Sequence, residues 1–120
     1  MNSILLIVSS DENCWLQIEA VSGEELIECY FVSHGDHLAE LVKRLNPFLL
    51  IVDFASEEQD WIIKHLSEIK ERRHDFPIIG VIPDEGEAHE VRLQKAGCDH
   101  VLRKGKFLPK IRAWIERYLR

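Results

Sequence analysis

The segment FLLIVDF, residues 48–54, decides the fold. Its unbroken apolar run from Phe48 to Val52 is typical of a strand that is covered on both faces, and the run ends at the acidic residue Asp53. The preceding Asn46-Pro47 dipeptide indicates the end of a helix, because a residue before proline avoids the helical region. A buried strand that follows a helix in this way is typical of a parallel sheet with helices on both faces.

Short apolar runs alternate with longer segments of helical period along the whole chain, which is the pattern of repeated βα units. The predicted strands are Ile4–Val8, Cys29–Val32, Phe48–Val52, Ile78–Ile82 and His100–Leu102. The predicted helices are residues 12–22, 36–45, 58–73, 86–96 and 107–119. The sequence therefore predicts an α/β fold, a (βα)5 doubly wound sheet of five parallel strands, and a single domain over residues 1–120.

The composition narrows the possible functions. The net charge of −6 argues against general nucleic-acid binding by this domain, because a polyanion would be repelled. Residues 103–120 hold seven basic residues and one acidic residue, a net +6, so residues 1–102 carry −12. This basic segment is either a solvated helix face or a docking surface for an acidic partner.

The cellular location of the protein can be predicted from its three cysteines and its N-terminal apolar run. Because the cysteines lack metal-ligand spacing, they are expected to be reduced thiols of a cytoplasmic protein; they are Cys14, Cys29 and Cys98. The apolar run at residues 4–8 lacks a basic leader and is too short for a signal peptide or a membrane span. No membrane partner is expected.

Ligands of open parallel sheets bind beyond the carboxyl ends of the strands, where the strand order reverses. The residues that follow the predicted strands are Ser9, Ser10 and Asp11 after the first, Asp53, Phe54 and Ala55 after the third, Pro83 and Asp84 after the fourth, and Arg103 and Lys104 after the fifth. One carboxylate, Asp53, and one lysine, Lys104, are expected to face each other across this edge.

Four segments resemble the sequence blocks of the receiver domains of two-component response regulators: ILLIV at 4–8, FLLIVDF at 48–54, PIIGVIP at 77–83 and KAGCDHVLRKG at 95–105. The resemblance spans essentially the whole chain and implies a flavodoxin-like sheet with strand order 2-1-3-4-5. In such receivers the aspartate that ends the third strand accepts a phosphoryl group from a histidine kinase beside Mg²⁺, and a lysine contacts the phosphoryl oxygens. Asp53 matches the phosphoacceptor, and Lys104 matches the lysine.

The metal-binding positions depart from this pattern. Ser9 and Ser10 stand where receivers have two acidic residues, and their neutral hydroxyls offer a divalent cation no charge. Mg²⁺ binding is therefore expected to be weak or absent, with Asp53 and Asp11 as its ligands if it occurs. Asp11 is expected to begin the first helix rather than to enter the site, since acidic side chains favour a helix N-terminus.

The switch positions depart as well. Ile82 stands where receivers have a threonine or serine that contacts the phosphoryl group, and Val101 stands where they have a mobile aromatic residue. Gly105 replaces the proline that follows the lysine. Without proline, the Lys104–Gly105 peptide bond is expected to be trans, and Lys104 is then expected to be aimed differently.

Two functions remain open. The favoured one is a degenerate receiver-like domain of two-component (phosphorelay) signal transduction, not an enzyme, which acts as a protein-interaction and regulatory module with weak or no Mg²⁺-dependent phosphorylation. The alternative is a working response regulator that a histidine kinase phosphorylates on Asp53.

The expected partners are proteins: a histidine kinase, an output domain or an effector, and a second copy of the chain. The dimer is expected to form through the fourth helix, fifth strand and fifth helix, where opposite charges lie on neighbouring elements. The acidic residues are Glu85, Glu87 and Glu90, and the basic residues are Arg103, Lys106, Lys110 and Arg112.

Overall fold

The computed structural model of the chain describes residues 3–33, 37–57, 59–86 and 89–119. Five parallel strands form one sheet in the order β2-β1-β3-β4-β5, which confirms the predicted fold class and strand order. The strands are β1 (Ser3–Val8), β2 (Ile27–Val32), β3 (Leu49–Asp53), β4 (Ile78–Ile82) and β5 (His100–Arg103). The helices are α1 (Glu12–Glu24), α2 (Leu38–Leu45), α3 (Gln59–Arg72), α4 (Glu90–Ala96), α5 (Lys104–Phe107), the 3-10 helix η1 (Leu108–Lys110) and α6 (Ile111–Tyr118).

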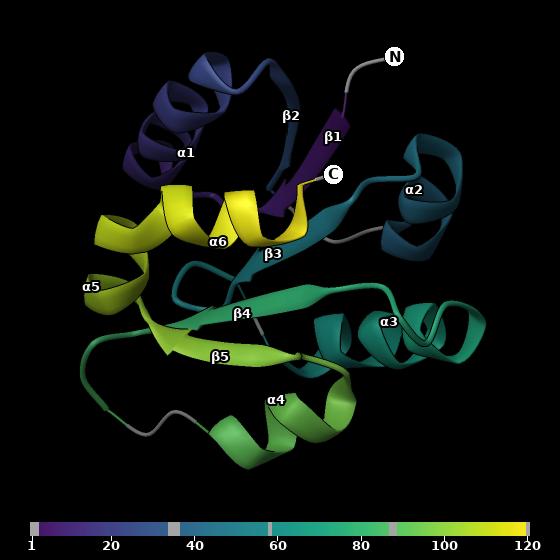
Figure 1. Cartoon of the computed structure of the whole chain (residues 1–120). Coiled ribbons are helices and arrows are strands. Elements are labelled where there is room, and N and C mark those ends of the chain that lie inside the picture. The colour runs from purple at the N-terminus through teal and green to yellow at the C-terminus, as the bar shows by residue number, and fades with distance from the viewer. Residues whose placement is uncertain (1–2, 34–36, 58, 87–88, 120) are drawn as a thin grey trace.

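Helices cover both faces of the sheet, with α1 and α6 on one face and α2, α3 and α4 on the other (Figure 1). Alternate residues of β3 serve the two layers: Leu50 and Val52 pack with α2 and α3, whereas Leu49 and Ile51 pack with α1 and α6. Every residue of β3 and β4 is buried. The prediction of strands covered on both faces is therefore confirmed.

The predicted strand bounds lie within two residues of those observed, but the prediction of the fifth helix is wrong. A continuous helix over 107–119 was expected, and the structure begins α5 at Lys104 and interrupts the helical segment with η1. Pro109 lies within η1 and lacks an N–H, so it cannot donate a regular helical hydrogen bond. The predicted starts of the second, third and fourth helices include residues 36, 58, 87 and 88, which lie outside the described residues.

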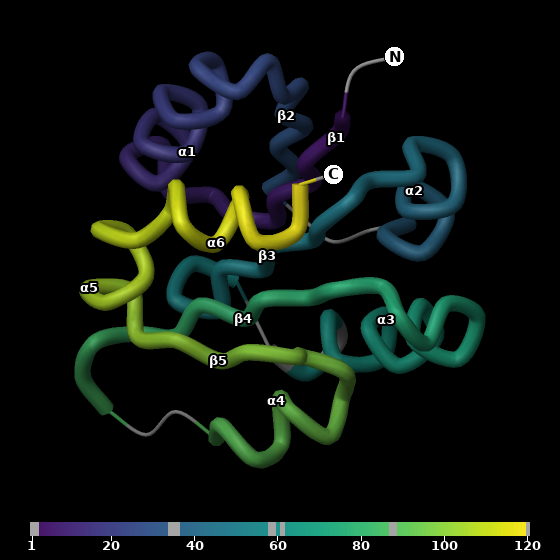
Figure 2. The backbone as a smooth tube through the Cα atoms, viewed as in Figure 1, coloured from purple at the N-terminus to yellow at the C-terminus, as the bar shows by residue number. Residues whose placement is uncertain are grey.

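Parallel strands all end at the same edge of the sheet, where the loops to α1, α3 and α4 and the start of α5 lie (Figure 2). The chain leaves β3 at this edge, so the side chain of Asp53 lies there. Among the described segments, no helix combines the length and the apolar character that crossing a bilayer requires.

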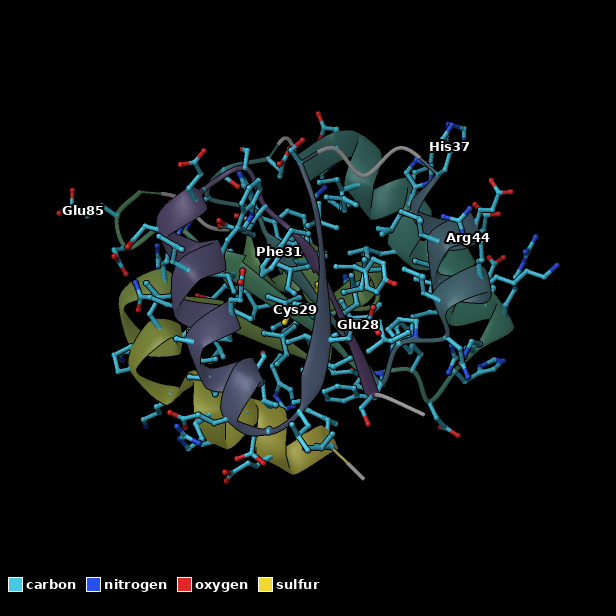
Figure 3. All side chains as sticks on the ribbon, turned by 90° about the horizontal axis from the view of Figure 1, so that it is seen from above. Glu28, Cys29, Phe31, His37, Arg44 and Glu85 are labelled. Atoms are coloured by element: carbon cyan, nitrogen blue, oxygen red, sulfur yellow. The ribbon has the colours of Figure 1, made fainter. Side chains whose placement is uncertain are left out.

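Strand β2 forms one border of the sheet and lies between α1 and α2 (Figure 3). Its side chains alternate: Cys29 and Phe31 lie towards α1, and Glu28 lies on the side of α2. The three cysteines are free thiols. Burial raises the pKa of Cys14 to about 11 and that of Cys98 to about 12, so both are protonated at neutral pH.

Leu26, at the turn between α1 and β2, has a left-handed backbone conformation with a φ of 57° and an exposure of 82%. Leu26 is the residue directly after the C-cap residue Glu25. Glycine is common at the position after a C-cap, because glycine has no Cβ. This leucine therefore adds strain to the turn and contributes almost no burial.

Leu26→Gly is expected to stabilise the protein by about 0.5–1 kcal/mol, because it relieves the left-handed strain and removes only an exposed side chain. Chemical denaturation monitored by circular dichroism measures the change. Leu16→Gly is the matched control, since Leu16 is also exposed but lies inside α1, where glycine costs about 1 kcal/mol. A loss of stability in both variants would contradict the argument.

Candidate functional site

The carboxylate of Asp53 is fully buried at the end of β3, and hydrogen bonds engage both of its oxygens. Its Oδ2 accepts from Ser9 Oγ at 2.8 Å and from Lys104 Nζ at 2.9 Å. Its Oδ1 accepts from the backbone N–H of Ala55 at 3.0 Å. The structure thus brings Asp53 and Lys104 together, as the sequence predicts.

The ammonium group of Lys104 bridges two carboxylates. Its Nζ lies 2.9 Å from Asp53 Oδ2 and 2.6 Å from Asp11 Oδ2, and 17% of the lysine side chain is exposed. Burial lowers the pKa of Lys104, but the hydrogen bonds to the two carboxylates outweigh it, so the net shift is upwards. Lys104 is therefore charged at neutral pH and pairs with both acids.

The Lys104–Gly105 peptide bond is trans, as predicted, and Lys104 still reaches Asp53. The start of α5 is held by the N–H of Gly105, which donates to Asp84 Oδ1 at 2.6 Å. A proline at this position has no N–H and cannot make that bond. The Asp84–Gly105 contact therefore fixes the backbone from which Lys104 extends.

Asp11 both caps the first helix and lines the site. The prediction that it lies at the start of the helix is confirmed, but the prediction that it stays out of the site is wrong. Its Oδ1 accepts from the N–H of Asn13 at 3.0 Å and so caps α1. Its Oδ2 accepts from Lys104. Because the two oxygens point in different directions, no remodelling of the loop is needed for Asp11 to line the site.

Asp11→Asn is expected to lower the free energy of unfolding by about 1 kcal/mol at pH 7, because asparagine keeps the helix cap but loses the charge that pairs with Lys104. The Lys104 hydrogen bond is the main cause that lowers the pKa of Asp11 below its ordinary 3.8, although burial opposes it. This contribution is present above pH 3.8 and is lost as the pH falls through the lower, folded value.

Denaturation curves of both proteins between pH 7 and strongly acidic conditions measure this dependence. The two stabilities are expected to converge as the pH falls below about 4, where the Asp11 carboxylate takes up its proton in the unfolded chain. A difference that stays constant over this range would show that the Asp11–Lys104 contact is not a charge pair.

Ser9 and Ser10 differ in their surroundings although they are adjacent in the sequence. The hydroxyl of Ser9 is buried, donates to Asp53 and accepts from the N–H of Asp11 at 3.1 Å. Ser10 is exposed and contacts Ser56: its N–H donates to Ser56 Oγ and its hydroxyl donates to the Ser56 carbonyl, both at 3.1 Å. Only Ser9 therefore contacts the central carboxylate.

Two further residues hold this edge together, and the sequence reasoning missed them. Ser56 joins the loop after β3 to the loop after β1 through its bonds with Ser10. Trp15 donates its indole N–H to the Ser9 carbonyl at 2.7 Å, and its ring lies 5.5 Å from that of Phe31. The only available signal was their closeness in sequence to the strand ends.

The side chains at this edge do not fit a divalent cation as they are arranged. The two expected ligands, Asp53 and Asp11, both direct Oδ2 at the ammonium of Lys104, so the lysine already places positive charge between them. Within the described ranges, no group of three or more His, Cys, Asp or Glu side chains could hold a metal ion. A cation bound by these two Oδ2 atoms would have to displace the ammonium of Lys104, which already contacts both of them.

Ile82 and Val101 lie in the apolar layer between the sheet and the helices α2 to α4. Ile82 is fully buried, and Val101 packs against the same cluster. Neither side chain can donate a hydrogen bond. The loop after β4 is instead held by Arg103, whose Nη1 donates to the Pro83 carbonyl at 2.6 Å and to the Gly86 carbonyl at 3.3 Å.

The charged face expected to form a dimer is only partly available. Glu85 points away from the body of the molecule (Figure 3), and Glu90, Lys106 and Lys110 are exposed. Arg112 was predicted for this face but pairs with Glu24 and Glu25 at the end of α1. Its guanidinium is committed within the chain because α6 packs beside α1. Glu87, also predicted for this face, lies outside the described residues.

No protein-family model matches the chain, and no curated protein matches it. Its structure is similar to that of a response regulator from Hahella chejuensis, with a TM-score of 0.82 and 18% identity over 98% of this chain and 96% of the other. It is also similar to the beryllofluoride-activated NtrC4 receiver domain dimer, with a TM-score of 0.73 and 21% identity over 96% and 98%.

A third similar structure is HP1043, an orphan response regulator of H. pylori, with a TM-score of 0.77 and 18% identity over 98% of this chain and 97% of the other. All three likenesses extend over almost the whole of both chains, at identities too low to carry more than the architecture. The chain therefore has the fold of response regulator receiver domains.

Proposed function

We propose that this chain is a receiver-like domain of two-component (phosphorelay) signal transduction whose phosphoacceptor site is degenerate. It acts as a protein-interaction and regulatory module rather than as an enzyme, with weak or no Mg²⁺-dependent phosphorylation of Asp53. The observation that carries this proposal is the bridge of Lys104 between Asp53 and Asp11, with the Ser9 hydroxyl on the same Asp53 oxygen.

Phosphoryl transfer depends on an accessible nucleophile and on positive charge that offsets the transferring group. The Asp53 carboxylate is fully buried, and both of its oxygens are already hydrogen-bonded. The charge of Lys104 is divided between two carboxylates, so little of it is left for an incoming phosphoryl group. These contacts favour a closed, resting arrangement over a reactive one.

The alternative function is that of a working phosphoacceptor. It is favoured by the identity of Asp53 at the end of β3 and by its direct contact with Lys104, the lysine that the resemblance assigns to the phosphoryl oxygens. In this case Lys104 would have to release Asp11 and turn towards the phosphoryl group.

Incubation with acetyl phosphate or beryllofluoride, with and without Mg²⁺, distinguishes the two functions. Intact mass spectrometry detects phosphorylation, and amide resonances near Asp53 detect beryllofluoride. We expect no mass gain and no shifted resonances at millimolar Mg²⁺. A Mg²⁺-dependent mass gain that is absent from Asp53→Asn would establish the alternative. That variant is a suitable control because asparagine keeps the shape of the side chain.

The partners we propose are a histidine kinase, an output domain or an effector. A second copy of the chain is a further proposed partner, through α4, β5 and the exposed lysines Lys106 and Lys110. A cytoplasmic location stays a prediction that rests on the free cysteines.

A further inference from the structure

A cavity of about 410 Å³ lies between the C-terminal ends of α2 and α3. Its lining residues are Ala39, Val42, Lys43, Asn46, Ile69, Arg72 and Arg73. Asn46 lies just before the start of β3, whereas Asp53 lies at its end. This cavity and the Asp53 site are therefore at opposite ends of the strands. Its volume falls within the range of about 300–1,000 Å³ that small-molecule sites occupy.

The floor of the cavity is apolar and belongs to the core. Val42 and Ile69 are 2% and 3% exposed, and Ala39 packs against the same core cluster. These side chains are held by the packing of α2 and α3 on the sheet, so the floor is preformed. Because Val42 and Ile69 are already almost fully buried, the apolar surface that a ligand can cover is that of the half-buried Ala39 and of the methylene stems of Lys43 and Arg72.

The rim of the cavity is cationic: Lys43, Arg72 and Arg73 line it, and no acidic side chain among the described residues does. These are three of the eight basic residues in residues 1–102, the part of the chain that carries a net −12. Three cations at one pocket of a chain with a net charge of −6 would attract a negatively charged ligand. The helix dipoles favour cations at the C-terminal ends of α2 and α3, but they do not explain the apolar cavity between these two ends.

The rim cations keep most of their binding capacity. Among the described residues, no acidic side chain lies within 4.0 Å of Lys43, and Arg72 has only an exposed ion pair with Glu68 at 3.6 Å. The guanidinium of Arg73 lies over the Phe76 ring, 4.7 Å from its centroid, which restrains the side chain beside the cavity. Guanidinium groups bind carboxylates through two parallel hydrogen bonds.

We infer that this α2–α3 pocket binds a small amphipathic carboxylate, with its apolar body against Ala39 and the methylene stems of the rim side chains and its carboxylate at the cationic groups of Lys43, Arg72 and Arg73. A single planar carboxylate matches the arginine donors and leaves the apolar body free to lie along these stems and Ala39. The inference is independent of the proposed function, because none of these residues contacts the Asp53 site.

Titration of the full chain with octanoate, followed by amide resonances, tests the inference. We expect saturable shifts that are confined to residues around the pocket, such as Val42, Asn46 and Ile69. Octanol, which lacks the charge, is expected to bind about tenfold more weakly, and acetate, which lacks the apolar body, is expected to cause no such shifts. Absent, non-saturable or dispersed shifts, or equal binding of octanoate and octanol, would overturn the inference.

Two matched double variants locate the carboxylate. Lys43→Met with Arg72→Met removes two rim cations that are both exposed, so folding should not suffer, and octanoate binding is expected to weaken about tenfold. Lys64→Met with Arg117→Met removes the same charge from exposed positions on α3 and α6 that do not line the pocket, and is expected to leave binding unchanged. Equal losses in both variants would show a general charge effect and contradict the site.

Discussion

Lys104→Met is expected to lower the free energy of unfolding by about 3–5 kcal/mol at neutral pH, because it leaves the buried carboxylate of Asp53 without its cation. Methionine keeps the apolar stem of the lysine, so the loss reports on the charge and its hydrogen bonds rather than on packing. Among the bonds from described residues, the Asp53 carboxylate would retain those from Ser9 and Ala55. Denaturant unfolding followed by circular dichroism measures the change.

A double-mutant cycle with Asp53→Asn isolates the pair. The double variant is expected to be more stable than the sum of the single effects implies, by about 2 kcal/mol, because the neutral amide no longer needs a cation. Lys106→Met, an exposed lysine in the same helix, is the control and is expected to change stability by less than about 0.5 kcal/mol. If Lys104→Met were as mild as this control, the bridge would not stabilise the fold.

Ser9→Asp is expected to make the stability of the protein respond to Mg²⁺, a response that we do not expect of the wild type. The introduced carboxylate would lie beside Asp53 Oδ2, which Ser9 Oγ approaches to 2.8 Å in the present structure. Three carboxylates around one lysine leave uncompensated negative charge, so the metal-free variant is expected to be less stable than the wild type. Mg²⁺ at 100 times its dissociation constant would restore about 2.7 kcal/mol.

Thermal unfolding with and without millimolar Mg²⁺ measures this gain. Ser10→Asp is the matched control, because Ser10 contacts Ser56 and is exposed, whereas Ser9 contacts Asp53. We expect Mg²⁺ to raise the midpoint of Ser9→Asp and to leave those of the wild type and Ser10→Asp unchanged. A midpoint of the wild type that already rises with Mg²⁺ would overturn the conclusion that its side chains do not fit the cation.

The two predictions describe one balance of charge. In this chain a lysine ammonium supplies the positive charge between Asp53 and Asp11, and it reaches both oxygens from the start of α5. Lys104→Met removes this positive charge, and the resulting loss in the free energy of unfolding measures how much the charge stabilises the fold. Adding a carboxylate beside that positive charge increases the negative charge until a divalent cation is favoured.

The sequence alone determined the architecture, because apolar periodicity reflects how neighbouring residues are buried. The run from Leu49 to Val52 required a strand covered on both faces, and parallel strands end at one edge. The meeting of Asp53 with Lys104 followed from this geometry without knowledge of any side-chain contact. That the side chains of Ile82 and Val101 can donate no hydrogen bond was also evident from residue identity alone.

Only the tertiary structure decided the contacts within the site. Asp11 and Lys104 are 93 residues apart, and their pairing depends on where α5 begins. The Asp84–Gly105 hydrogen bond holds this start at Lys104, whereas the helical period predicted a start at residue 107. The difference between Ser9 and Ser10 depends in the same way on the loop that carries Ser56. Local sequence patterns encode burial and turns, whereas these bonds form only after separate loops have packed together, so no local pattern predicts them.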